Sequence, residues 1–187
     1  MWEFLYIYSN AFTGSTITGK ITFPSKLLTI EKNAFQNSTL CNVDLSQCGI
    51  LKTWDSAFAE STITGALELC TSWTEIATKA FRSTTLASID FSQCTALTHI
   101  KEEAFYNSSL THINLIGCKN LETLGTKAFG KTSKPNPIVI LSQGKSHVAM
   151  GRPITDNVTF TFRTRREMIS YLWYLEVGRN IRQYNVV

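Results

Sequence analysis

The dipeptide Ala-Phe occurs six times at an almost constant spacing, and this repeat constrains the fold more than any other feature of the chain. The intervals between successive copies are 23, 23, 23, 24 and 24 residues. Self-similarity at a period of this size indicates a solenoid, in which each repeat buries its apolar face only against its neighbours. The copies are Ala11-Phe12, Ala34-Phe35, Ala57-Phe58, Ala80-Phe81, Ala104-Phe105 and Ala128-Phe129.

Five of the six Ala-Phe copies are preceded by an aliphatic residue, namely Ile7, Ile30, Ile76, Ile100 or Leu124. The copies are followed by a run in which apolar and polar residues alternate, which is typical of a half-buried strand. Two repeat subtypes are visible. Repeats 11–33 and 57–79 read Ser-Thr-Ile-Thr-Gly before the strand, whereas repeats 34–56, 80–103 and 104–127 read Leu-x-x-(Val/Ile)-x-(Leu/Phe). Later apolar residues are expected to complete the inner wall of each turn, namely Leu27, Leu51, Trp73, Leu97 and Leu121.

The period and the Ile-x-x-x-Ala-Phe pattern resemble the BspA-like, treponemal-type class of leucine-rich repeats. The resemblance covers about residues 1–141 and implies a right-handed solenoid with a parallel sheet on its concave face. It also implies that a short strand or a tight helical turn around Ala-Phe forms the opposite wall. Two departures are expected, because Trp54 and Trp73 replace aliphatic residues and the turn at Trp54 is one residue short.

The chain is expected to divide into a solenoid, residues 1–141, and a C-terminal cap, residues 142–187. The solenoid opens in mid-repeat, so we expect a fragment or a trimmed form of a longer protein. In the cap, the alternation at Val158–Phe162 predicts a strand. The Thr164-x-x-Glu167 capping box predicts a helix over Glu167–Val177. A terminal repeat needs its apolar face covered, which favours a capping role, although a partner-binding appendage stays open.

Composition argues against several classes of function. Residues 1–127 hold nine Lys/Arg and eleven Asp/Glu, and residues 128–187 hold nine and three, but no nucleic-acid reader motif accompanies this basic end. No apolar run is long enough to span a membrane. Gly125–Thr132 matches a P-loop pattern, yet Pro135 follows where a helix is required, so no nucleotide or other cofactor is expected.

Five cysteines leave at least one thiol unpaired within the chain. Cys48, Cys94 and Cys118 share one repeat position, so we expect a column of small buried side chains. The spacing typical of zinc sites is absent, and no metal site is expected.

Outward strand positions of successive repeats should form columns on the concave sheet, because side chains alternate between the two faces of a strand. The middle column is acidic, and the C-terminal end of the face is apolar. We expect a binding face made of Asn42, Asp44, Glu68, Ser88, Asp90, His112, Asn114, Ile116 and Val139. A third column is expected to contain Pro24, Ser46, Cys70, Ser92 and Ile116.

Ser88, His112 and Asp90 are neighbours in this register and superficially resemble a catalytic triad. Catalysis also needs a directed hydrogen-bond chain and an oxyanion hole, which an open sheet of short side chains does not supply. The sequence therefore predicts no enzyme.

The resemblance implies a non-enzymatic protein-binding module, exported or on the cell surface, that engages a host matrix or serum protein in adhesion. Two alternatives stay open: a small hydrophobic ligand at the apolar C-terminal end of the concave face, and an intracellular scaffold. Self-association is also left open.

Overall fold

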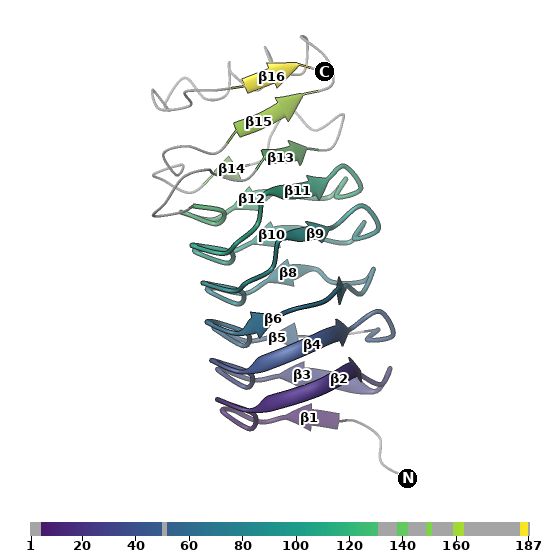
Figure 1. The fold of residues 1–187 in the computed structure, drawn as a ribbon. Coiled ribbons are helices and arrows are strands. Elements are labelled where there is room, and N and C mark those ends of the chain that lie inside the picture. Colours follow the sequence, from purple (N-terminus) through teal and green to yellow (C-terminus); the bar gives the residue numbers. More distant parts are fainter. Residues whose placement is uncertain are drawn as a thin grey trace.

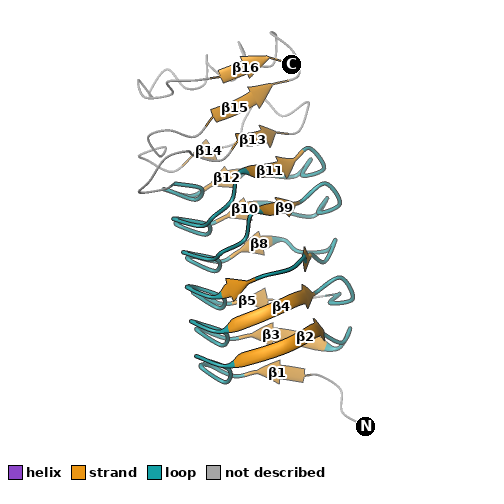
Figure 2. Ribbon diagram, viewed as in Figure 1, coloured by secondary structure: helices purple, strands orange, loops and turns teal. Residues whose placement is uncertain are grey.

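The computed structural model is a parallel β-solenoid of stacked turns (Figure 1). It describes residues 5–49, 52–130, 138–141, 149–150, 159–162 and 184–186. Each turn crosses from a front wall to a back wall, and all pairings between turns are parallel. The described part of the chain contains strands and turns and no helix (Figure 2), so the turn around Ala-Phe is formed without helical residues.

The front wall carries the longer strands and is built from two parallel sheets. One has the order β2-β4-β6, with β7 also paired to β4, and the other has the order β16-β15-β13-β11-β9. The strands are β2 Thr16–Thr22, β4 Thr39–Asp44, β6 Thr62–Ile63, β7 Leu67–Glu68, β9 Ser88–Asp90, β11 His112–Leu115, β13 Ile138–Leu141, β15 Thr159–Phe162 and β16 Tyr184–Val186.

The back wall consists of short strands, again in two sheets, with orders β1-β3-β5 and β14-β12-β10-β8. These strands are β1 Leu5–Ile7, β3 Leu27–Ile30, β5 Lys52–Thr53, β8 Glu75–Ile76, β10 His99–Ile100, β12 Thr123–Leu124 and β14 Ala149–Met150. The strand expected at Val158–Phe162 is present as β15, which pairs with β13. The helix expected over Glu167–Val177 lies outside the described residues.

The Ala-Phe corners hold the turns together. The first five corners are each flanked by two residues with positive φ, one directly before the alanine and one two residues after the phenylalanine, as at Asn33 (φ 58°) and Asn37 (φ 54°). The phenylalanine amide donates to the alanine carbonyl of the next turn, for example Phe58 to Ala80 at 2.8 Å. The buried alanine is explained by this close approach, because a larger side chain would meet the next turn.

The corner phenylalanines form a continuous stack through the interior. Ring centroids of successive members lie 5.0 to 5.6 Å apart. Phe81 in the middle of the stack is fully buried between Phe58 and Phe105 and also meets Trp73 edge-on. Stacking of large apolar rings contributes packing energy beyond the area buried, so this stack is a major source of stability.

Two sequence interpretations are corrected by the structure. Thr53 pairs with Ile30 and fills the buried position, while Trp54 is 56% exposed and donates its indole N–H to the Thr29 hydroxyl at 3.2 Å. Trp54 therefore does not replace the aliphatic residue. The prediction for Trp73 is correct, because its side chain is only 1% exposed in the core.

Cys70 is the second correction, because it is buried with Cys48, Cys94 and Cys118 rather than exposed in an outward column. Three residues lie between Leu69 and Trp73, whereas five lie between Phe91 and Leu97. The shorter loop brings Cys70 into the interior, and the Cys94 thiol donates to its carbonyl at 3.6 Å. All five cysteines are free.

Candidate functional site

The outward columns expected on the concave sheet lie on the front wall in the expected register. Lys20 pairs with Asn42 and Thr22 with Asp44, and farther along Ser88 pairs with His112 and Asp90 with Asn114. Alternation explains the arrangement, since the intervening Val43, Ile89 and Ile113 are buried.

Val139 does not share this outward register. It pairs with Ile113, and Leu141 pairs with Leu115, and both of these partners are fully buried. The backbone therefore aligns Val139 with the inward column. Ile116 is 36% exposed, so an exposed apolar residue is present near this end of the wall, but Val139 is not part of the same outward column.

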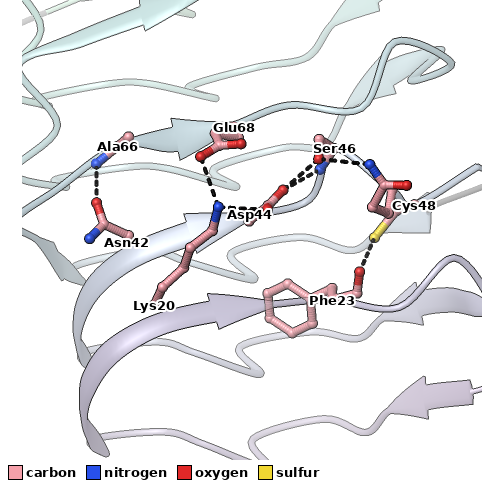
Figure 3. Close-up of polar contacts among 9 residues, drawn as sticks. Lys20, Phe23, Asn42, Asp44, Ser46, Cys48, Ala66 and Glu68 are labelled. Atoms are coloured by element: carbon pink, nitrogen blue, oxygen red, sulfur yellow. Dashed lines mark hydrogen bonds and ion pairs between the residues drawn. The ribbon is translucent and has the colours of Figure 1, made fainter.

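The acidic column is partly neutralised within the protein (Figure 3). The Lys20 ammonium lies 2.8 Å from an Asp44 carboxylate oxygen and 3.1 Å from a Glu68 oxygen, so one cation spans three turns. Asp44 also accepts hydrogen bonds from the Ser46 hydroxyl at 2.6 Å and the Ser46 amide at 3.0 Å. The Lys20 hydrogen bond, followed by the Ser46 bonds, lowers the pKa of Asp44 to about 2.

The pKa of Lys20 is shifted in the opposite direction to that of Asp44. Hydrogen bonds to Asp44 and then Glu68 raise the pKa of its ammonium above the ordinary value. Sequence reasoning did not identify this ion pair as an internal contact. Lys20, Asp44 and Glu68 are 24 residues apart in the sequence, so they lie in successive turns about one strand spacing apart, and this signal could have predicted the ion pair.

Asp90 is the repeat equivalent of Asp44 but has no such cation. Its carboxylate accepts the same local bonds, from the Ser92 amide at 2.8 Å and the Ser92 hydroxyl at 3.1 Å. Among the described residues, no basic side chain lies within ion-pairing distance of it. The position that corresponds to Lys20 one turn before Asp90 is Ala66, whose side chain is too short to reach.

The three residues of the superficial triad are close in register but are not connected. The His112 ring nitrogen Nδ1 lies 3.1 Å from the Thr111 hydroxyl, and the Asp90 carboxylate is held by Ser92. No hydrogen bond in the described part of the chain links Ser88, His112 and Asp90 in series. The geometry provides no activated serine.

A groove opens in the front wall between β7 and β9, where the two sheets fail to join. It encloses about 520 Å³ and is lined by residues 62–67 of one turn and 85–90 of the next. This volume lies within the range of ligand-binding clefts. Sequence reasoning missed the groove. The Ser-Thr-Ile-Thr-Gly subtype alone could not mark its position, because β2 has the same subtype and pairs with β4 through a register shift.

Gly65 accounts for one border of the groove. A Cβ at this position would overlap the Asn42 side chain and the Cys41 carbonyl, so only glycine permits the approach. The Gly65 amide donates to Cys41 at 2.8 Å, and the Ala66 amide donates to the Asn42 side chain at 2.9 Å. These bonds hold the chain against the preceding turn and away from the following one.

The family comparison agrees with this architecture. Six copies of the BspA type leucine rich repeat region match residues 5–136. The chain belongs to the BspA-type leucine-rich repeat family. No curated protein matches the chain, and no solved structure matches it.

Membership of the BspA-type family indicates a protein-binding repeat module, and the family is generally associated with surface proteins. In the described part of this BspA-type chain, no cluster of three or more His, Cys, Asp or Glu side chains could hold a metal ion. The same residues contain no helix that is long and apolar enough to cross a bilayer.

Proposed function

We propose that this protein is a non-enzymatic binding module, exported or displayed on the cell surface, that contacts a host matrix or serum protein in adhesion. The observation that carries the proposal is the family match over residues 5–136. The front wall supports it, because a broad wall of exposed polar side chains suits a protein partner better than a small substrate.

The front wall offers distinct chemistry at its two halves. Near its N-terminal end, Lys20 already pairs with Asp44 and Glu68, so these acids are not free for a partner. Farther along, Ser88, Asp90 and His112 are exposed, and Asp90 has no internal cation in the described structure. We therefore place the contact surface on the half of the wall that includes β9 and β11.

The test is a pull-down of extracellular-matrix and serum proteins by the whole chain, at low and physiological salt. A front-wall variant, Asp90→Asn with His112→Ala, should lose the captured protein, because it removes a charge and an exposed ring from the contact surface. Glu102→Gln removes one charge from an exposed corner position and serves as the control, which should still capture it.

Capture that is unchanged in the front-wall variant would contradict this placement. Capture of cytosolic proteins, with none from matrix or serum, would contradict the surface role and favour an intracellular scaffold. Salt sensitivity is expected for the genuine partner, since exposed ion pairs are screened by salt.

A further inference from the structure

The groove between β7 and β9 exposes backbone groups that are paired elsewhere on the front wall. Val43 donates to the Ala66 carbonyl at 2.9 Å and Leu45 to the Glu68 carbonyl at 2.9 Å, so Ala66 and Glu68 direct their carbonyls toward β4. Successive residues of a strand direct these groups to opposite sides. The N–H and C=O of Leu67 are therefore directed toward the groove.

The opposite border has the same property. Thr111 donates to the Ala87 carbonyl at 2.9 Å, and Phe91 donates to the Asn114 carbonyl at 2.9 Å, so Ala87 and Phe91 bond toward β11. Ser88 and Asp90, which alternate with them, direct their backbone groups toward β7. A continued ladder would join Leu67 to both, but no such bond forms between these described residues.

The wall is instead bridged at one end of the groove by a side chain. The Thr85 hydroxyl donates to the Ile63 carbonyl at 3.1 Å and accepts from the Ile63 amide at 2.9 Å. Beyond this bridge the groove stays open, over a floor that includes the buried residues Leu86 and Ile89. An open slot between two unpaired strand edges is a surface that an extended polypeptide can pair with.

The protein contains its own example of how a cation fits this wall. Lys20 lies across the outward column and reaches Asp44 in the next turn (Figure 3). Asp90 repeats the carboxylate and its Ser92 bonds, while Ala66 leaves the position of the lysine empty beside the groove. A lysine or arginine supplied from outside would restore the missing ion pair.

We infer that this groove binds an extended, basic segment of a protein partner. The segment places a lysine or arginine over Ala66, where the cation pairs with Asp90, and its main chain hydrogen-bonds to the free edges at Leu67 and Ser88. This inference rests on the proposed protein-binding function and names both the partner's chemistry and the place of contact.

The experiment uses the whole chain and a short, end-blocked peptide of alternating threonine and lysine, with a threonine-glutamine peptide for comparison. Binding is followed by calorimetry and by amide chemical shifts. The lysine peptide should bind more tightly, and the largest shifts should fall on Leu67, Ser88 and Asp90. Equal affinity for both peptides, or shifts confined to the back wall, would overturn the inference.

Two variants test the cation directly. Asp90→Asn keeps the acceptor for the Ser92 amide but removes the charge, and should weaken lysine-peptide binding about fivefold, which is the effect of an exposed ion pair. Ala66→Lys supplies an internal cation at the groove and should abolish binding. Glu122→Gln removes one charge at an exposed position away from the groove and should leave affinity unchanged.

These outcomes separate the groove from the broader function. A matrix or serum protein that Ala66→Lys still captures would overturn the groove as the contact site while leaving the protein-binding function intact. A lysine peptide that binds at the groove, in a protein that captures nothing from matrix or serum, would support the groove and contradict the proposed partner class.

Discussion

At the scale of single residues, the same repeat position can have opposite properties because of one neighbour in the preceding turn. Asp44 and Asp90 both accept hydrogen bonds from a serine two residues later. Asp44 is paired with Lys20, and its side chain is 10% exposed, whereas Asp90 is exposed and faces Ala66 across the groove. Whether the carboxylate is paired within the protein or available to a partner therefore depends on the residue in the preceding turn, Lys20 for Asp44 and Ala66 for Asp90.

The depressed pKa of Asp44 predicts a specific dependence of stability on acid. Its folded pKa of about 2 is below the unfolded value, so its contribution is fully present above about pH 4 and is lost as the pH falls toward 2. Denaturant unfolding of the native chain and of Asp44→Asn should converge across this range. A constant difference between the two down to pH 2 would contradict the assignment.

The buried cysteines predict a selective reaction with alkylating reagents. Burial raises the pKa of Cys48 to about 11 and those of Cys94 and Cys118 to about 12, so almost no thiolate forms at pH 8. Cys41 is only half-buried. Iodoacetamide followed by mass spectrometry should label Cys41 first in the folded protein, and Cys48, Cys94 and Cys118 only after unfolding. Labelling of Cys94 as early as Cys41 would show that the reagent reaches the buried cysteine column in the folded protein.

At the scale of elements, the corner is the most regular unit and the front strand the most variable. The five corners from Ala34-Phe35 onward each combine a left-handed residue, a buried alanine and a stacked phenylalanine, and their bonds are nearly identical from turn to turn. The front strands range from seven residues in β2 to two in β7. The corner therefore keeps the turns in register where strand pairing does not.

Phe81 tests the stack. Phe81→Ala should lower the free energy of unfolding by about 3–5 kcal/mol, because it leaves a cavity between two stacked rings. Phe12 ends the stack and is 39% exposed, so Phe12→Ala should cost clearly less. Thermal and urea unfolding measure both variants. An equal decrease in the free energy of unfolding for the two variants would show that the central ring contributes no more to stability than the terminal one.

Gly65 tests the border of the groove. Gly65→Ala should lower stability by about 1–3 kcal/mol, because the added methyl overlaps the Asn42 side chain and the Cys41 carbonyl. Gly49→Ala is the matched control, since nothing lies within 4 Å of a Cβ at that position. A neutral Gly65→Ala, compared by urea unfolding, would mean that the turn has room to shift.

The repeat made the elements easy to predict and their exceptions difficult. The period and the buried phenylalanines were visible from the sequence because every turn meets the same packing constraint. Trp54 and Cys70 were placed on the wrong face, and the backbone of Val139 aligns with another column than expected, since each depends on a loop length or a register that varies between turns. The groove and the Lys20 ion pair arise between turns, so no single repeat contains the information for them.

At the scale of the whole molecule, the solenoid is continuous along its corners and divided along both walls. The front sheets separate between β7 and β9, and the back sheets separate between β5 and β8. The phenylalanine stack passes through this level without a break, with Phe58 and Phe81 5.2 Å apart. At this level the two halves are therefore joined at the corner and by the Thr85 bridge to Ile63 on the front wall.

Hydrogen exchange should detect the divided wall. Val43 and Leu67 occupy paired register positions, but the Val43 amide donates to Ala66 whereas the Leu67 amide faces the groove. The Leu67 amide should exchange much faster than that of Val43 in native conditions, because local opening is not needed to expose it. Equal protection of the two amides would mean that the front wall is closed in solution.

The uninterrupted stack and the divided walls also give the rod a direction of bending. Rings in contact resist shortening or lengthening along the corner, whereas the front wall beside the groove lacks a strand ladder and is bridged by Thr85 and Ile63. Bending should therefore concentrate at this one level, where β7 and β9 would move apart about the phenylalanine stack. A load applied along the axis would change the width of the groove before it disturbed the core.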